Sequence, residues 1–365
     1  MNKPKILIVT SEFPPQPGGI GNHAYYLALY LTKNGYAVTV IADQRDVDNT
    51  EEIAFDAFLP FVVKRIQLKG VRLFMYLNRI VKTFGGLKQT DHVIATGKFS
   101  LWNVAFCSLF YKRNTMAVIH GSEVNLRAAV LKKLIDLSLK RFETLVAVSG
   151  YTSRLVGHLE RDIQVIPNGI DLSEWQVNTS SETKLNGTPV LTTVGRVSSR
   201  KGQLEVIKLL PELLKVYPHA HYHCVGIPTE APDFIAQAKA LGVDNHVTFH
   251  GTVSDADLKS LLLATDVFVM LSVESSTGDV EGFGIAILEA NALGIPAIGS
   301  KGCGIADAIK DGVSGFLVDV QDVAAFGSSL NTLLNEQDKF KAQAKAWAAQ
   351  HDWNQIVKRY LLHLS

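Results

Sequence analysis

Short apolar runs alternate along this chain with longer segments in which apolar residues recur at helical spacing. Residues 5–10 form such a run, the helical pattern follows from Tyr25 to Leu31, and residues 37–42 form the next run. Continuous runs are typical of parallel strands that are buried on both faces. The order of strand, helix and strand predicts a βαβ unit with helices on both faces of a parallel sheet. Further strands are predicted at residues 92–95, 116–119, 144–148 and 164–166.

The same pattern starts again after a turn-rich passage at residues 167–189. A strand at 190–194, a glycine-bearing basic loop at 195–202 and a helix at 204–216 open the second half. Its other strands are predicted at residues 221–225, 246–249, 267–271, 297–298 and 315–318. The chain therefore predicts two doubly wound α/β domains, residues 1–168 and 169–349. Ligands of such sheets bind at the carboxyl ends of the strands, so a cleft between the domains is expected to hold the ligand.

The final segment, residues 347–364, carries Trp353, Ile356 and Tyr360 at helical spacing. It predicts one helix, of which the part from about residue 350 to residue 365 packs back onto the first domain. A length of 365 residues agrees with two domains, because one hydrophobic core rarely serves so long a chain.

Composition describes an ordinary folded protein, with 47% hydrophobic and 19% charged residues and a net charge of +1. The average hides a basic region at residues 61–141, whose acids are Asp91, Glu123 and Asp136. Within it, residues 71–82 form an aromatic and basic amphipathic pattern. That pattern fits a helix at an anionic membrane surface and fits equally a domain helix with a solvated basic face. No nucleic-acid recognition motif accompanies the charge, so nucleic acid is not an expected partner.

Three cysteines, Cys107, Cys224 and Cys303, stand far apart and show no metal-ligand spacing. Free thiols in a reducing compartment are expected. The first apolar run leaves no room for a signal peptide, and no apolar run reaches the length of a membrane span. We therefore expect a cytoplasmic protein that associates peripherally, if at all, with the inner face of a membrane.

Two carboxylates stand eight positions apart within residues 279–290. Glu281 lies in a loop with Gly282 and Gly284, and Glu289 follows an apolar run. A helix that begins near Gly284 would place Glu289 in its early turns, close to the N-terminal amides that attract anions. This layout fits a sugar joined through diphosphate to a nucleoside. It also fits an ordinary loop with acids near a helix start.

The loop at residues 195–202 brings Gly195, Arg196 and Lys201 to the end of a strand. Two cations there could clamp a diphosphate and stabilise its charge as it leaves. The alternative is a solvated surface cluster. Cations are unfavourable at a helix N-terminus, which favours an anionic ligand as the explanation.

An earlier glycine loop contains Gly19 and Gly21 in the pattern G-x-G-x-x-A, with Asp43 about twenty residues on. Dinucleotide-binding proteins have this arrangement. Their turn passes directly from strand to helix, however, whereas here residues 13–17 intervene with three prolines. Such a glycine loop can still bind phosphate through its backbone N–H groups. His120 follows another apolar strand and is a candidate contact for a sugar hydroxyl.

Motifs for a bound metal are missing from the sequence, which has no HExxH, no Cys/His zinc spacing and no P-loop. Asp255 and Asp257 resemble a DxD metal motif. Because Ser254 precedes them, they are better explained as the acidic first turn of a capped helix. No metal and no cofactor are expected.

Taken together, these features resemble the retaining glycosyltransferases of the GT-B fold, family 4, which have two facing Rossmann-like domains. The segments that carry the resemblance are residues 18–21, 166–171, 194–196 with 201–202, and the pair Glu281 and Glu289. Together they span nearly the whole chain in the family's order and spacing. Residues 225–229 depart from the family's V-G-x-G-P pattern, so the donor-side loop there is expected to differ.

The resemblance implies a role for each of these residues. Glu289 would bind the ribose hydroxyls of the donor nucleotide, and Glu281 would hold the donor sugar together with backbone N–H groups of Gly282, Phe283 and Gly284. Arg196 and Lys201 would neutralise the diphosphate next to Gly195, helped by amides at Gly19 and Gly21. His120 would lie near the sugar. Transfer would retain anomeric configuration without a metal, by front-face attack in which the leaving phosphate helps to deprotonate the acceptor.

Residues 278–282 and 120–123 are similar to those of the mannosyltransferases that act on phosphatidylinositol mannosides. The similarity favours GDP-mannose over a UDP-sugar as donor, and a lipid-linked or cell-envelope glycan as acceptor. Two other functions stay open from the sequence. One is an NAD-dependent oxidoreductase or epimerase using Gly19, Gly21 and Asp43, and the other is a non-catalytic protein that binds sugar nucleotides.

Overall fold

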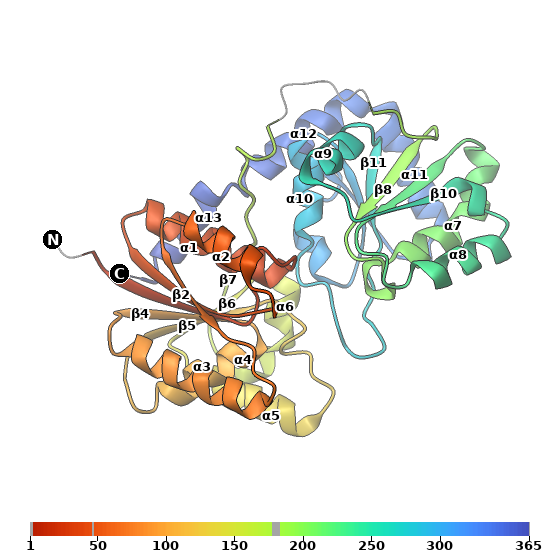
Figure 1. Ribbon diagram of the computed structural model, residues 1–365. Coiled ribbons are helices and arrows are strands. Elements are labelled where there is room, and N and C mark those ends of the chain that lie inside the picture. Colours follow the sequence, from red (N-terminus) through yellow and green to blue (C-terminus); the bar gives the residue numbers. More distant parts are fainter. Residues whose placement is uncertain (1–2, 46, 177–182, 365) are drawn as a thin grey trace. The chain divides into compact units, whose positions relative to one another are not determined.

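The computed structural model describes residues 3–45, 47–176 and 183–364, which form two compact units (Figure 1). Unit 1 comprises Met1–Gly169 and Trp353–Ser365, and unit 2 comprises Ile170–Asp352. Each unit contains one parallel sheet between two layers of helices. This is the architecture that the alternation of apolar runs and helical segments predicts.

The sheet of unit 1 has seven strands in the order β3-β2-β1-β4-β5-β6-β7. Its centre is apolar, because Ile8 of β1 pairs in register with Val40 of β2 and with Ile94 of β4. The strands are β1 (Lys5–Thr10), β2 (Ala37–Asp43), β3 (Val62–Ile66), β4 (His92–Thr96), β5 (Asn114–Ile119), β6 (Thr144–Ala147) and β7 (Ile163–Val165). All neighbours run parallel, so the carboxyl ends of the strands lie along one edge of the sheet.

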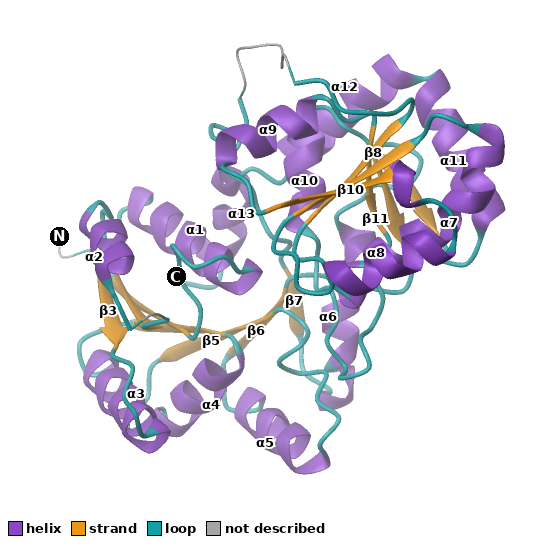
Figure 2. Ribbon diagram, turned by 45° about the vertical axis from the view of Figure 1, so that its right-hand side comes forward, coloured by secondary structure: helices purple, strands orange, loops and turns teal. Residues whose placement is uncertain are grey.

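Two groups of helices cover this sheet, one on each face. Figures 1 and 2 show α1, α2 and α13 on one face and α3, α4 and α5 on the other. The helices of unit 1 are α1 (Gly19–Lys33), α2 (Thr50–Ala57), α3 (Arg72–Leu87), α4 (Lys98–Cys107), α5 (Ala129–Leu139), α6 (Gly150–Leu155), the short 3-10 helix η1 (Gly157–Leu159) and α13 (Trp353–Leu361). Helix α13 packs on α1 although more than 300 residues separate them, and the hydroxyl of Tyr360 is hydrogen-bonded to His23 at 2.9 Å.

The sheet of unit 2 has six strands in the order β10-β9-β8-β11-β12-β13. They are β8 (Val190–Val194), β9 (His221–Val225), β10 (Val247–Gly251), β11 (Val267–Met270), β12 (Ala297–Ser300) and β13 (Gly315–Val318). The helices are α7 (Gln203–Val216), α8 (Ala231–Ala240), α9 (Asp255–Leu263), α10 (Ile285–Ala292), α11 (Val323–Asn335) and α12 (Gln337–Ala349), with 3-10 turns η2 (Ser199–Lys201), η3 (Asp244–His246) and η4 (Gly304–Asp307). Helices α7, α8 and α11 lie on one face and α9, α10 and α12 on the other (Figure 2).

The structure departs from the sequence-based expectation in two elements. The single helix expected at residues 347–364 is wrong, because α12 ends at Ala349 and α13 begins at Trp353. Between them the chain turns at residues 350–351, and Ile170 donates a backbone hydrogen bond to His351 at 2.9 Å. Strand β3 was not predicted, since Lys64 and Arg65 interrupt its apolar pattern at the edge of the sheet.

Several expectations about local structure are confirmed. Ser254 caps α9 by accepting a hydrogen bond from the backbone N–H of Asp257 at 3.2 Å, as expected of a helix start. The thiols of Cys107, Cys224 and Cys303 are free and buried. Of the helices in the described ranges, none has the length and apolar content needed to cross a bilayer.

A row of histidines follows the edge of the unit 2 sheet. Nδ1 of His223 lies 3.0 Å from Nε2 of His250, and Nε2 of His221 lies 2.8 Å from the hydroxyl of Thr248. Burial, followed by the neighbouring imidazoles, lowers the pKa of His221 to about 4, and burial lowers the pKa values of His223 and His250. These three imidazoles are therefore neutral in the folded protein.

This row makes unit 2 sensitive to acid. A histidine whose pKa is lower in the folded than in the unfolded state stabilises the fold above the unfolded pKa, and this stability is lost as the pH falls below it. Replacing His221 by Gln should therefore reduce the loss of unfolding free energy between pH 7.5 and pH 5 by about 1 kcal/mol, after allowance for solvent screening. Urea unfolding at the two pH values measures this loss. His219→Gln, at an exposed position two residues away, should lose as much as the wild type; equal losses in both variants would contradict the prediction.

Candidate active site

The loop between β8 and α7 is folded tightly by glycines. Gly202, the residue before α7, has φ +79°, and a Cβ there would lie 1.9 Å from the carbonyl oxygen of Leu271 at the end of β11. Gly226 also lies close to Gly195, because a Cβ on Gly226 would be 2.3 Å from the carbonyl oxygen of Gly195. The backbone N–H of Val197 donates to the carbonyl of Ile227 at 2.9 Å. These contacts fix the basic loop against the carboxyl ends of β9 and β11.

Lys201 of this loop is paired with Glu281. Its Nζ lies 2.9 Å from Oε2 of Glu281, and Arg200 forms a second ion pair with the same oxygen. Arg200 also binds Asp279, with Nε 3.0 Å from Oδ2. Burial alone would raise the pKa of Glu281, but Lys201 and Arg200 outweigh it and lower that pKa, so the carboxylate is ionised.

Arg196, the second predicted diphosphate contact, lies apart from this cluster. Its side chain is exposed, and within the part of the chain that the structure describes it forms no ion pair. Arg200 was missed by sequence reasoning. Its position beside Lys201 was the available signal, but the sequence cannot tell which of the two arginines turns toward the acidic loop.

The turn after Glu281 is held through its backbone. The N–H of Gly304 donates to the carbonyl of Glu281 at 2.9 Å, and a Cβ on Gly304 would lie 2.0 Å from the carbonyl oxygen of Gly282. Gly284 has φ +88° and directly precedes α10. Phe283 is buried with its ring 6.0 Å from that of His351, so only its backbone is available to a ligand.

Glu289 is the fifth residue of α10, in the early turns as predicted. Burial raises its pKa to about 7, Lys201 lowers it, and Glu174 and Asp255 raise it further. No described residue gives this carboxylate a hydrogen bond or an ion pair. A half-buried carboxyl without a partner is costly, and hydroxyl donors of a ligand would lower that cost.

His120 of unit 1 follows β5 and is almost fully buried. Its Nε2 lies 2.7 Å from the hydroxyl of Thr96, and its backbone N–H donates to Glu123. Burial lowers the pKa of His120 to about 3, so the imidazole is neutral and can bind a hydroxyl but cannot act as an imidazolium acid. Sequence reasoning missed His23, whose ring meets that of His120 edge-on at 4.9 Å.

The first glycine loop lies at the start of α1. Gly18 is the residue before the helix, and the N–H of Asn22 donates to its carbonyl at 2.9 Å. A Cβ on Gly21 would lie 3.1 Å from the backbone nitrogen of Phe13, whereas nothing lies within 4 Å of one on Gly19. Gly21 thus allows the proline-rich loop to pack against the helix, and the amides near Gly19 remain approachable.

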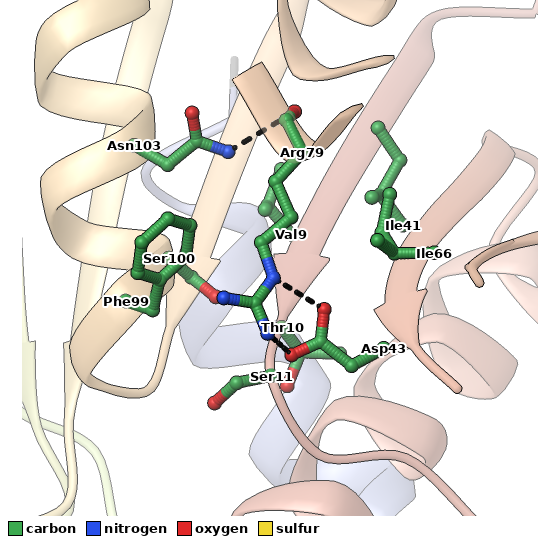
Figure 3. Close-up of a pocket in the computed structure, with 10 residues that line it drawn as sticks. All are labelled: Val9, Thr10, Ser11, Ile41, Asp43, Ile66, Arg79, Phe99, Ser100 and Asn103. Carbon is green, nitrogen blue, oxygen red and sulfur yellow. Dashed lines mark hydrogen bonds and ion pairs between the residues drawn. The ribbon is translucent and has the colours of Figure 1, made fainter. Parts of the chain in front are cut away.

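Asp43 is unsuited to the ribose role that the dinucleotide alternative requires. Arg79 binds both oxygens of its carboxylate, with Nε 2.6 Å from Oδ1 (Figure 3). The guanidinium also lies over the ring of Phe99, 4.3 Å from its centroid. This ion pair lines a small pocket at the carboxyl ends of β1 and β2, together with Thr10 and Ser11. A ribose would have to displace Arg79 to reach Asp43.

Comparison with known proteins identifies both halves of the chain. Residues 17–174 match the family model described as Glycosyltransferase Family 4, and residues 177–350 match that described as Glycosyl transferases group 1. The chain is a family 4 glycosyltransferase of the GT-B fold.

Curated relatives of this glycosyltransferase match it over nearly its whole length. The GDP-mannose-dependent alpha-(1-6)-phosphatidylinositol monomannoside mannosyltransferase of Mycobacterium tuberculosis is 26% identical over 97% of this chain and 96% of its own. The enzyme of the same name from Mycolicibacterium smegmatis is 29% identical over 95% and 93%. Among solved structures, Anabaena HepE in complex with UDP superposes with a TM-score of 0.79 at 20% identity, covering 99% of each chain. The last likeness concerns the fold.

The predicted site residues of this glycosyltransferase divide between its units. Gly19, Gly21 and His120 belong to unit 1, and Gly195, Arg196, Lys201, residues 282–284, Glu281 and Glu289 belong to unit 2. Within unit 2 the structure brings Lys201 and Glu281 into contact and places Glu289 within electrostatic reach of Lys201. The ligand cleft between the units and the role of each residue stay predictions.

Glu289 should lower the stability of the free enzyme. A carboxyl with a folded pKa of about 7 loses stability as the pH rises from its ordinary value of 4.5 through 7, because the folded state retains the proton longer. We expect Glu289→Gln to be more stable than the wild type at pH 8 by about 1–2 kcal/mol and equally stable at pH 4.5, measured by urea unfolding. Glu212→Gln, at an exposed carboxylate of α7, should show no such pH-dependent gain. A Glu289→Gln protein less stable at pH 8 would refute the argument.

Proposed function

We propose that this glycosyltransferase transfers a hexose from a nucleotide sugar, with GDP-mannose favoured over a UDP-sugar, to a lipid-linked or cell-envelope glycan. One observation carries the proposal: ionised Glu281, held by Lys201, occurs in the same unit as the carboxyl of Glu289, to which no described residue is hydrogen-bonded or ion-paired. The two carboxylates can accept hydrogen bonds from two sets of hydroxyls, and the positive charge of Lys201 suits a diphosphate. The names of the curated relatives support GDP-mannose as the donor and a phosphatidylinositol mannoside as the acceptor class.

In this proposal Glu289 accepts hydrogen bonds from the ribose hydroxyls, and Glu281 accepts them from the sugar. The bond between the anomeric carbon and the phosphate oxygen breaks while the acceptor oxygen attacks from the same face. The acceptor proton passes to a phosphate oxygen, so configuration is retained and no metal is required. Lys201 and Arg196 stabilise the charge on the departing diphosphate, which is where electrostatic stabilisation has most effect. Neutral His120 hydrogen-bonds a sugar hydroxyl.

The donor site can be tested by thermal unfolding with GDP-mannose, UDP-glucose, ADP-glucose and NAD. A ligand at one hundred times its Kd adds about 2.7 kcal/mol, which raises the Tm by several degrees. We expect a shift with one nucleotide-sugar class, its loss in Glu289→Ala, and its retention in Glu212→Ala. A shift with NAD alone would overturn the proposal and support the oxidoreductase alternative. Donor binding without hydrolysis or transfer to any glycolipid acceptor would support the non-catalytic alternative.

We also propose that unit 1 associates with an anionic membrane through α3 and α5, at the inner face of the membrane. Helix α3 is only partly covered by the rest of unit 1. Ile80 and Phe84 pack against the core and Arg79 and Thr83 point inward, while Phe74, Leu77 and Val81 are exposed. Helix α5 and the end of α4 add further exposed apolar side chains on the same face of the sheet (Figure 1): Phe106, Leu109, Phe110, Val130, Leu131, Leu134 and Leu137. This surface disfavours the alternative of a solvated basic face for α3.

Cations accompany these apolar side chains, as a surface that binds anionic lipid requires. Lys132 and Lys133 of α5 are exposed beside Val130 and Leu134. A lipid-linked acceptor would be reached most directly by an enzyme bound at the bilayer. The apolar contribution and the charge would act together, since either alone gives weak binding.

Vesicle sedimentation tests the membrane proposal. The wild type should bind vesicles of mixed phosphatidylcholine and phosphatidylglycerol at low salt, and bind them less as salt is raised. Val81→Glu should bind about tenfold more weakly, because it removes an aliphatic contact with the bilayer and adds an anion. Val216→Glu is the matched control, since Val216 is 71% exposed in unit 2 and Val81 is 68% exposed. No sedimentation of the wild type at low salt, or equal loss in both variants, would refute the proposal.

A further inference from the structure

Arg200 occupies the centre of a four-residue charge cluster in unit 2. Its Nε lies 3.0 Å from Oδ2 of Asp279, and its Nη1 binds Oε2 of Glu281. Lys201 reaches the same Oε2 at 2.9 Å. A planar guanidinium can bind two carboxylates at once in a fixed geometry, which the single ammonium of a lysine cannot do.

The cluster orients Glu281 through one of its two oxygens. Both cations contact Oε2, and within the described ranges no side chain binds Oε1. A carboxylate held at one oxygen keeps the other available to accept a hydrogen bond from a ligand. Arg200 thus determines which oxygen of Glu281 is presented.

The backbone around Arg200 is held in place as well. The N–H of Val273 donates to the carbonyl of Arg200 at 3.1 Å, and the neighbouring Gly202 packs directly against Leu271. On the other side, the N–H of Ser275 donates to the carbonyl of Asp279 at 2.9 Å, and the N–H of Asp279 donates to Oγ of Ser275 at 2.9 Å. The guanidinium of Arg200 therefore connects two segments whose backbones are each held by hydrogen bonds.

We infer that Arg200 is a positioning residue for the donor sugar, acting through Glu281. This role rests on the proposed function of Glu281. It differs from the diphosphate role proposed for Arg196, whose exposed side chain has no ion pair in the described part of the chain. Arg200 binds two carboxylates and affects the sugar only through Glu281. Lys201 binds Glu281 and, in the proposed function, also the phosphate.

The consequence is a separation between sugar binding and nucleotide binding. Removing Arg200 leaves Glu281 with Lys201 alone, so Lys201 is drawn from the phosphate and Oε1 loses its fixed orientation. The pKa of Glu281 also rises, because one of the two cations that lower it is lost. Binding of the sugar should therefore weaken more than binding of the nucleoside diphosphate, and it should weaken further at acidic pH.

The test compares the Kd of a nucleotide sugar with that of its nucleoside diphosphate, GDP-mannose with GDP and UDP-glucose with UDP, by titration calorimetry. For the pair that the wild type binds, Arg200→Met should raise the Kd of the nucleotide sugar about tenfold. It should raise the Kd of the diphosphate by less than about threefold. The pH below which acid weakens binding of the nucleotide sugar should be higher in this variant than in the wild type. Arg200→Lys should recover part of the loss. Lys208→Met, which removes an exposed ion pair of α7, should match the wild type.

Each outcome distinguishes the inference from the function on which it rests. Equal weakening of nucleotide sugar and diphosphate would show that Arg200 contacts phosphate, and unchanged constants would show that it does nothing for the donor; either overturns the role. Failure of the wild type to bind any nucleotide sugar would overturn the proposed function and this role with it. Asp279→Asn, which loosens Arg200 without removing it, should raise the Kd of the nucleotide sugar about threefold and tests the role if Arg200→Met does not fold.

Discussion

A buried carboxyl stays ionised in this fold only where cations outweigh its burial, and the site of unit 2 is built around that requirement. Glu281 is largely removed from water, and burial alone would favour its protonated form. Lys201 and Arg200 come from a loop some 80 residues earlier in the chain and reverse that preference. The ionised state of Glu281 is thus produced by the folding of two separate segments against each other, and neither segment creates it alone.

Close backbone contacts allow the loop with Lys201 and the loop with Glu281 to pack together. Gly202 lies against Leu271, and Gly304 lies against Gly282, at distances that leave no room for a side chain. Without these contacts the loop that carries the cations and the loop that carries Glu281 would be kept apart. The pKa of Glu289 shifts in the opposite direction. Lys201 only partly offsets the effect of burial, so this pKa is raised. One unit therefore holds two carboxyls whose environments move their pKa values in opposite directions.

Much of this architecture could be predicted from local pattern. Strands buried on both faces are recognised as apolar runs, and the position of Glu289 follows from Gly284 preceding the helix. The pairing of Arg200 with Asp279 could not be predicted, because it depends on which of two nearby arginines turns toward a distant loop. The break at residues 350–352 has a similar cause. Helical spacing continues through it, whereas in the structure the chain turns at residues 350–351 and the carbonyl of His351 accepts a hydrogen bond from Ile170.

Unit 1 shows the limits of pattern in another way. The amphipathic period of α3 was evident, but the inward side of the helix was not. Arg79 and Thr83 point inward because Asp43 and Asn103 bind them, Ile80 and Phe84 pack inward beside them, and Phe74, Leu77 and Val81 are left on the outside. A periodicity reports that a helix has two faces. Tertiary partners decide which of them is covered.

The return of α13 to unit 1 has a consequence for biosynthesis. Trp353 stacks with Tyr26 and Tyr30, and Tyr360 is hydrogen-bonded to His23, so residues translated after unit 2 complete a core begun by residues translated before it. On the ribosome, the sheet of unit 1 emerges with one face of α1 uncovered and waits while the whole of unit 2 is made. Unit 2 can fold as an inserted domain during that interval. The nascent chain thus spends much of its synthesis with an aromatic surface exposed, which is the period in which chaperones would protect it.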